Sequence, residues 1–243
     1  MSNLHIVSSF QNVYNEILSL NDNPIAPVKY AMDEKTHMRM THKHVPLSIM
    51  PTEFYFIKDI IVDNNLQQGY ELATAFGISA LAAGMGFKET GGKLVTLDAY
   101  IEEQTEDAGT YESFINRPIV TDADGLKSAK FLAAQFKVES HIDFAIGWSP
   151  ESVADTIKKT FGETPKIDYV FIDGGHFESQ ILADLTAVTP FLASTGFILF
   201  HDVWTPPFTD ELKEKITNIL GSSIEIVLPY PSGENMGIVR YAR

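Results

Sequence analysis

From residue 51 to the end of the chain, short apolar runs alternate with stretches of helical spacing. Such an alternation with apolar strands predicts a parallel sheet that helices cover on both faces. Right-handed crossovers then make the fold a doubly wound, three-layer α/β sandwich. The five expected strands are 69–73, 93–99, 141–147, 167–175 and 195–203, and the helices that follow them are 79–87, 125–137, 150–162, 178–192 and 209–221.

The last two apolar runs, 223–230 and 235–243, break this alternation. Only the six residues 229–234 plausibly join them, too few for a helical crossover. A parallel pair needs a connection of a dozen or more residues, so these two strands should form an antiparallel hairpin at the sheet edge.

The first 50 residues differ from the rest. They hold one amphipathic stretch, with Phe10, Val13, Ile17 and Leu20 at helical spacing, and then a segment rich in Pro, His and Met over 24–50. We interpret 1–50 as an N-terminal extension that covers the substrate, and 51–243 as the main domain. A metal site at His37, His42 and His44 is the less favoured alternative. Residues 51–64 read as a helix with a proline in its first turn.

Composition narrows the class of partner. The 32 acidic and 18 basic residues leave a net charge of −14, which argues against binding nucleic acid or anionic lipid. Without any cysteine the chain has no disulfide, thiolate ligand or thiol nucleophile. No signal peptide or membrane-spanning run is seen, so we expect a soluble cytoplasmic protein. Whether it forms a homo-oligomer stays open.

Ligands of doubly wound sheets bind at the carboxyl ends of the strands. At the first such end, Glu71 can accept hydrogen bonds from a cationic ligand, and the small residues Ala73 and Gly77 permit close approach to the backbone. The glycine fingerprint of dinucleotide sites is missing, which counts against NAD or FAD. The alternative is a turn of small residues that packs helix on strand.

The next two strand ends also suit a nucleoside. Asp98 can accept both hydroxyls of a ribose. Trp148 could stack on an adenine, or it could cap the core.

The fourth and fifth strand ends carry the most informative side chains. Asp173 and Asp202 could bind a hard divalent cation, which would neutralise buried carboxylates. His176 could act as a general base beside it. In the alternative, Asp173 caps the next helix and His201 is a core histidine with satisfied hydrogen bonds.

From about residue 66 to 243 the sequence resembles a class I S-adenosylmethionine-dependent methyltransferase. The matching pieces are YELATAFGISAL, KLVTLDAY, KIDYVFIDGGHFESQILADL, TGFILFHDV and MGIVRY. The stretch VFIDGGH…DL…GFILFHDV is similar to the small-molecule O-methyltransferase branch, which includes antibiotic-tailoring enzymes, some of them Mg-dependent. The resemblance implies a seven-stranded, mostly parallel sheet that ends in the hairpin.

The resemblance also implies roles. His176 and Asp173 would be catalytic, and Asp173, His201 and Asp202 would hold a metal. The cofactor would contact Glu71, Ala73, Thr74, Gly77, Ser79, Asp98, Trp148, Ser149 and Asp173.

Two residues depart from the family pattern. Ala73 stands where the family usually has its first glycine, and His201 stands where relatives often carry a third acid. The histidine softens the site, so Mg²⁺, another divalent ion or no metal are all open.

The predicted reaction is O-methylation of a hydroxylated small molecule such as a sugar, polyketide or catechol, with S-adenosylmethionine as methyl donor. The alternatives are a non-catalytic S-adenosylmethionine-binding module, methylation at nitrogen or on a protein, and a nicotinamide-dependent oxidoreductase.

Overall fold

A computed structural model of the chain describes residues 12–31, 44–46, 49–100, 122–175, 177–202, 209–221, 224–227 and 236–243. Its centre is a seven-stranded sheet in the order β5-β4-β3-β6-β7-β9-β8. The strands are β3 (Gln68–Leu72), β4 (Lys93–Asp98), β5 (Ile142–Ile146), β6 (Ile167–Ile172), β7 (Leu192–Phe200), β8 (Ile224–Val227) and β9 (Gly237–Ala242).

Strands β3 to β7 are all parallel, whereas β9 pairs antiparallel with both β7 and β8. The predicted mostly parallel sheet with a closing antiparallel hairpin is therefore confirmed. The chain runs outward from β3 through β4 to β5, and then returns to β6 beside β3. This change of direction puts the switch point of the sheet between β3 and β6.

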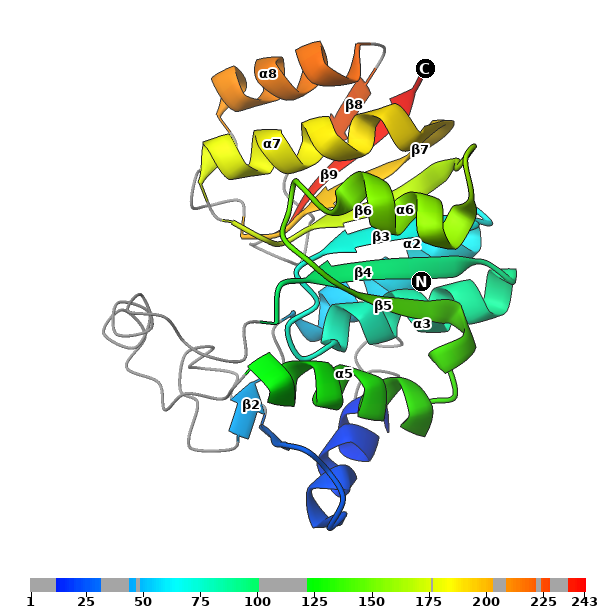
Figure 1. The fold of residues 1–243 in the computed structure, drawn as a ribbon, viewed down its shortest axis with the longest axis vertical. Coiled ribbons are helices and arrows are strands. Elements are labelled where there is room, and N and C mark those ends of the chain that lie inside the picture. The colour runs from blue at the N-terminus through cyan, green and yellow to red at the C-terminus, as the bar shows by residue number, and fades with distance from the viewer. Residues whose placement is uncertain are drawn as a thin grey trace.

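Helices cover both faces of the sheet, as Figure 1 shows. One face packs against α2 (Pro51–Asp63), α3 (Ile78–Thr90) and α5 (Asp122–Gln135). The other face packs against α6 (Val153–Phe161), α7 (Glu178–Val188) and α8 (Asp210–Leu220). Within the described part of the chain, no helix is both long and apolar enough to cross a membrane.

The alternation of side chains along β6 explains why both faces are apolar. Tyr169 and Phe171 belong to the hydrophobic cluster with α2 and α3, while Val170 and Ile172 belong to the cluster with α7 and α8. All four side chains are buried. Because successive residues of a strand point to opposite faces, only a continuous apolar run can fill both layers.

The structure corrects several predicted boundaries by two to four residues. The helix expected over 178–192 ends at Val188 and continues as the 3₁₀ helix η3 (Thr189–Phe191), because Pro190 cannot donate the next α-helical hydrogen bond. Strand β7 therefore begins at Leu192, before the expected residue 195. The helix expected from residue 150 begins at Val153, after a turn at residues 149–152.

The described part of the N-terminal extension packs into the main core. Residues 12–19 are helical, and η1 (Leu20–Asp22) and strand β1 (Lys29–Ala31) follow. Ile17 and Tyr30 are buried in the same hydrophobic cluster as α2 and α3. The Tyr30 hydroxyl lies 2.8 Å from the Ser128 hydroxyl of α5, and in Figure 1 the blue N-terminal segment lies beside that helix.

Strand β1 pairs in parallel with β2 (His44–Pro46) in a small sheet that the sequence pattern did not predict. His37, His42 and Phe10 lie outside the described residues, so the covering role of 1–50 stays a prediction. The 3₁₀ helix η2 (Glu139–His141) leads into β5.

Gly77 offers a test of the packing between α3 and α5. Its φ is +85°, and an added Cβ would lie 2.5 Å from Ala129 Cβ and 2.7 Å from Ala129 Cα. Gly91 has a similar φ of +79° but no atom within 4 Å of the added Cβ. Gly91→Ala should lower the free energy of unfolding by about 1–2 kcal/mol from backbone strain. Gly77→Ala should lower the free energy of unfolding by a further ~1–3 kcal/mol, because the added methyl group overpacks the contact with α5. Equal losses in urea unfolding would refute the predicted clash with Ala129.

Candidate functional site

The sheet ladder brings the predicted site residues to one edge. The amide of Asp173 donates to Leu72 O at 3.2 Å, and the amide of His201 donates to Ile172 O at 3.0 Å. The residues that follow β3, β6 and β7 therefore lie side by side at the switch point, as predicted.

The loop after β3 follows a path that normally favours glycine. Ala73, Ala75 and Gly77 have φ values of 74°, 45° and 85°. The left-handed region costs a non-glycine residue about 1–2 kcal/mol, and such strain is typical of functional sites. Ala73, at the position where the family usually carries glycine, thus adopts the conformation that a glycine would adopt. Its amide donates to Leu97 O at 2.9 Å, which holds the loop against β4.

Glu71 is 1% exposed, and its Oε2 has no hydrogen-bond partner among the described residues. Burial raises the pKa of Glu71 to about 7, while hydrogen bonds with Ser79 and Thr96 act in the opposite direction. The carboxylates of Asp173 and Asp98 also raise this pKa. A cationic ligand beside Glu71 would favour its ionised form.

Asp98 organises two loops at the end of β4. Its Oδ2 accepts a hydrogen bond from Ala75 N at 2.8 Å, and its Oδ1 accepts one from Tyr100 N at 3.1 Å. An ionised carboxylate has about four lone-pair positions, so two would remain for the hydroxyls of a ribose.

Two of the predicted cofactor contacts, Thr74 and Ser79, are buried and already engaged within the protein. The Thr74 hydroxyl lies within hydrogen-bond distance of the Thr96 hydroxyl. Ser79 hydrogen-bonds with Glu71. These side chains support the loop from beneath, so a direct contact with a cofactor would come from the backbone.

The loop after β5 presents Trp148 to solvent. Trp148 is 60% exposed, so the alternative in which it caps the core is wrong. The neighbouring Ser149 hydroxyl donates to Asp184 Oδ1 of α7. Asp184 is 4% exposed, and burial raises its pKa. This hydrogen bond ties the loop to α7.

Asp173, His201 and Asp202 form a compact donor set. One ligand atom from each lies within 4.8 Å of the others. His201 Nδ1 lies 3.3 Å from Asp173 Oδ1 and 3.6 Å from Asp202 Oδ2, but it makes no hydrogen bond of acceptable geometry with the described residues. The N-cap of α7 is Phe177 rather than Asp173. The alternative in which Asp173 caps the helix is therefore wrong, whereas the buried His201, with carboxylates near its ring, fits both the metal-ligand and the core-histidine interpretation.

The other nitrogen of His201 faces a residue that the sequence analysis missed. Glu53 of α2 is fully buried, and its Oε2 lies 3.3 Å from His201 Nε2. The same oxygen accepts a hydrogen bond from Met50 N at 2.7 Å. A glutamate in the first turn of a helix that begins at a proline is a recognisable helix-start signal, but nothing local indicates a partner 148 residues away.

Burial alone would lower the pKa of His201. The carboxylates of Asp173, Asp202 and Glu53 around the ring outweigh burial and raise this pKa well above its usual range. His176, the predicted general base, lies outside the described residues.

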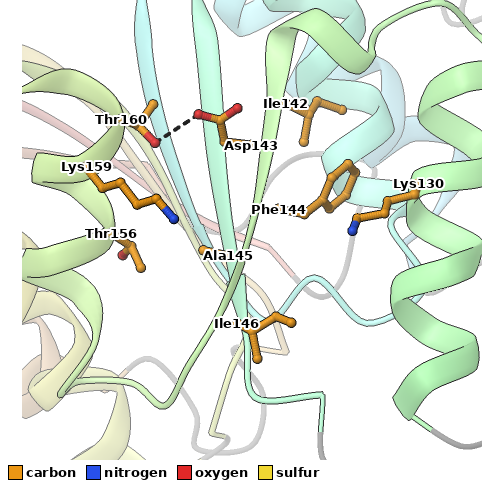
Figure 2. A pocket seen from close by; sticks show the side chains of 9 residues that line it. All are labelled: Lys130, Ile142, Asp143, Phe144, Ala145, Ile146, Thr156, Lys159 and Thr160. Carbon is orange, nitrogen blue, oxygen red and sulfur yellow. Dashed lines mark hydrogen bonds between the residues drawn. The ribbon is translucent and has the colours of Figure 1, made fainter.

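A separate groove of about 570 Å³ lies along the edge strand β5 and contains none of these residues. Figure 2 shows Lys130 of α5 and Lys159 of α6 on either side of the strand. Lysines beside an exposed edge strand discourage pairing with a strand of another molecule. This role accounts for the two lysines in the groove without a ligand.

A doubly wound sheet with an antiparallel closing hairpin, and with acids at the ends of β3, β4 and β6, is consistent with the fold of the class I methyltransferases. Comparison of the sequence with family profiles narrows the class, because residues 71–203 match the methyltransferase domain. This match spans more than half of the 243 residues, and the chain belongs to that family. The family excludes the nicotinamide-dependent alternative.

Solved structures share the fold. An O-methyltransferase from Bacillus cereus, in complex with SAH, has 15% identity and a TM-score of 0.58, over 96% of this chain and 91% of that chain. TomG from Streptomyces achromogenes, an O-methyltransferase involved in tomaymycin synthesis and solved with SAM, has 13% identity and a TM-score of 0.53, over 81% and 82%. No curated protein matches the sequence.

The raised pKa of Glu71 predicts a pH-dependent stability. Between its ordinary value of 4.5 and about 7, the folded chain holds a proton that the unfolded chain has lost. The contribution of Glu71 is thus fully present below pH 4.5 and is lost as the pH rises, at about 1.4 kcal/mol per unit. Urea unfolding should show the stability of the wild type falling relative to Glu71→Gln up to about pH 7, and no further change above it. Parallel pH profiles for the two chains would disprove the shift.

Proposed function

We propose that this methyltransferase uses S-adenosylmethionine to methylate a hydroxyl oxygen of a small molecule. The observation that carries the proposal is the buried Glu71 beside a loop with three left-handed residues that Asp98 holds in place. Buried negative charge of this kind suits a ligand that is both cationic and a nucleoside, and the sulfonium cofactor has both properties. The SAM and SAH present in two solved relatives of the same fold support this choice.

Each strand end would have its own part in binding. The backbone of 73–77 would wrap the methionine portion, with Glu71 near its positive charge. Asp98 would accept the ribose hydroxyls. Trp148 is exposed and would stack on the adenine, where an aromatic ring offers a flat apolar face.

Asp173, His201 and Asp202 would hold a divalent metal. Metal–oxygen distances of about 2.1 Å put donors on opposite sides of an ion at about 4.2 Å from each other. The observed set, within 4.8 Å, fits this size after a small contraction. The position of His201 Nδ1 supports the assignment, because this nitrogen faces two carboxylates. One imidazole among carboxylates suits Mn²⁺, Co²⁺ or Zn²⁺ as well as Mg²⁺.

A metal in this site would orient an acceptor hydroxyl and lower its pKa. His176 would take the proton as the methyl group leaves sulfur and bonds to oxygen, a contribution typically worth about 10²–10⁴-fold. The remaining contribution of the chain is alignment of acceptor and methyl group, which can supply up to roughly 7–11 kcal/mol.

Acceptor selection would belong to the segments around 24–50 and 99–124. Tyr100, buried and with a φ of 42°, begins the second segment directly after Asp98. Most of both segments lies outside the described residues, so the acceptor is proposed only as a hydroxylated sugar, polyketide or catechol.

Asp98→Asn tests the cofactor site. Loss of charged hydrogen bonds of about 1.5–3 kcal/mol should weaken binding of S-adenosylmethionine and S-adenosylhomocysteine by about tenfold to a hundredfold in calorimetric titration. The matched control is Asp168→Asn. Asp168 accepts hydrogen bonds from the backbone of Gln67 and Gln68 at the opposite end of the sheet, so its loss should affect stability without affecting cofactor affinity. Equal effects of the two substitutions on affinity would reject the assignment of Asp98.

Metal removal tests the reaction. In single-turnover assays with a panel of catechol, sugar and polyketide acceptors, EDTA should slow methyl transfer, and Mg²⁺ or Mn²⁺ should restore it. Asp173→Asn should lower the rate in the same way and resist rescue by metal. Binding of S-adenosylhomocysteine should survive EDTA. An unchanged rate of methyl transfer in EDTA would remove the metal from the mechanism.

A further inference from the structure

Glu53 occupies an unusual place for a helix-capping residue. It lies in the first turn of α2, outside the residues 71–203 that match the methyltransferase family, yet its side chain is fully buried against the end of β7. Its Oε2 accepts from Met50 N and lies within reach of His201 Nε2. Its Oε1 has no hydrogen-bond partner among the described residues.

The contact with Glu53 determines the role of one ring nitrogen of His201. An ionised carboxylate only accepts hydrogen bonds, so Nε2 must be the donor in the 3.3 Å contact with Glu53. Nδ1 then points toward the carboxylates of Asp173 and Asp202, so either a proton or a metal ion can occupy the space between the three atoms. The ring is further held by Phe171, whose centroid lies 5.9 Å away at an interplanar angle of 52°.

We infer that Glu53 is a positioning residue that holds the Nε2–H of His201 and so presents Nδ1 as a metal ligand. A metal-binding histidine usually donates its second N–H to a carboxylate or a carbonyl, which orients the ring and raises its basicity. This inference rests on the metal site of the proposed function, and it adds a residue from a helix that no family motif covers. It also accounts for the histidine at position 201, where relatives often carry a third acid. Glu53 of α2 supplies the missing carboxylate, so Glu53, Asp173 and Asp202 together surround the His201 ring.

Capping alone does not explain the arrangement. A cap requires one oxygen near Met50 N, and the first turn of a helix normally keeps such a carboxylate in water. Complete burial of a carboxylate costs free energy unless it is paired. The histidine provides that pairing.

Glu53→Gln and Glu53→Ala test the inference. The glutamine keeps the size and can still cap α2, but its neutral amide can also present an N–H to His201 and so no longer holds the Nε2–H. Mn²⁺ titrated into the full chain, followed by electron paramagnetic resonance, should bind Glu53→Gln about 10–100-fold more weakly than the wild type, and Glu53→Ala at least as weakly. The ¹⁵N shifts of His201 in the metal-loaded chain, with diamagnetic Zn²⁺ in place of Mn²⁺, should report a protonated Nε2 that bonds to Glu53 in the wild type and a shifted Nε2 signal in Glu53→Gln.

The control for cap loss is Thr209→Ala. The Thr209 hydroxyl accepts from Leu212 N at 3.2 Å at the start of α8, so its removal weakens a helix start far from α2. It should leave Mn²⁺ affinity unchanged. S-adenosylhomocysteine affinity should remain at the wild-type value in all three variants.

Wild-type Mn²⁺ affinity in both Glu53 variants would overturn the inference, as would a wild-type chain that binds no Mn²⁺. In the latter case, S-adenosylhomocysteine binding together with methyl transfer in EDTA would leave the proposed methyltransferase function intact. Loss of cofactor binding in the wild type would instead refute the proposed function itself.

Discussion

Negative charge that is withdrawn from water is the constraint on which the site depends. Glu53 and Glu71 are both almost completely buried, and Asp173 and Asp202 lie close to the buried His201. Carboxylates in such surroundings must be protonated, paired or bound to a cation. The fold does not disperse these charges over its surface, where a chain of net charge −14 has many others, but gathers them at the switch point of the sheet. Cationic ligands are the natural complement of this arrangement.

The backbone and the charges depend on one another. Asp98 accepts the amide of Ala75, whose φ of 45° is unfavourable for an alanine, and the amide of Tyr100, whose φ is 42°. Hydrogen bonds to an ionised acceptor are worth about 1.5–3 kcal/mol, comparable to the strain of a left-handed residue. The same carboxylate therefore stabilises two strained turns and remains available to a ligand. The two alanines in this loop can follow a glycine-like path because β4 holds it in place.

Periodicity was sufficient to predict the sheet. The strand ends at Asp98, Asp173 and His201 follow from apolar runs that stop abruptly, and parallel strands align such ends at one edge. The boundary between α7 and β7 was less accurate, because the apolar residues around Pro190 fit a helix and a strand equally well. Trp148 was ambiguous for a related reason: an aromatic residue at a strand end suits both core and pocket, and only the path of the following turn decides. The pairing of Glu53 with His201 was beyond prediction, since it depends on how α2 docks and not on any local pattern.

The distance in sequence between Glu53 and His201 has a consequence for folding. Helix α2 is made early, whereas His201, directly after β7, comes 148 residues after Glu53, so the contact closes one of the longest loops in the molecule. Closing a long loop costs chain entropy, and few other contacts compensate for this cost early in folding. Contacts between residues far apart in sequence therefore tend to form late. The sheet and its hydrophobic layers can therefore be in place before the histidine has its final orientation. The metal site would then form in a last step. A chain in which α2 had not yet docked would be compact but would lack a working site.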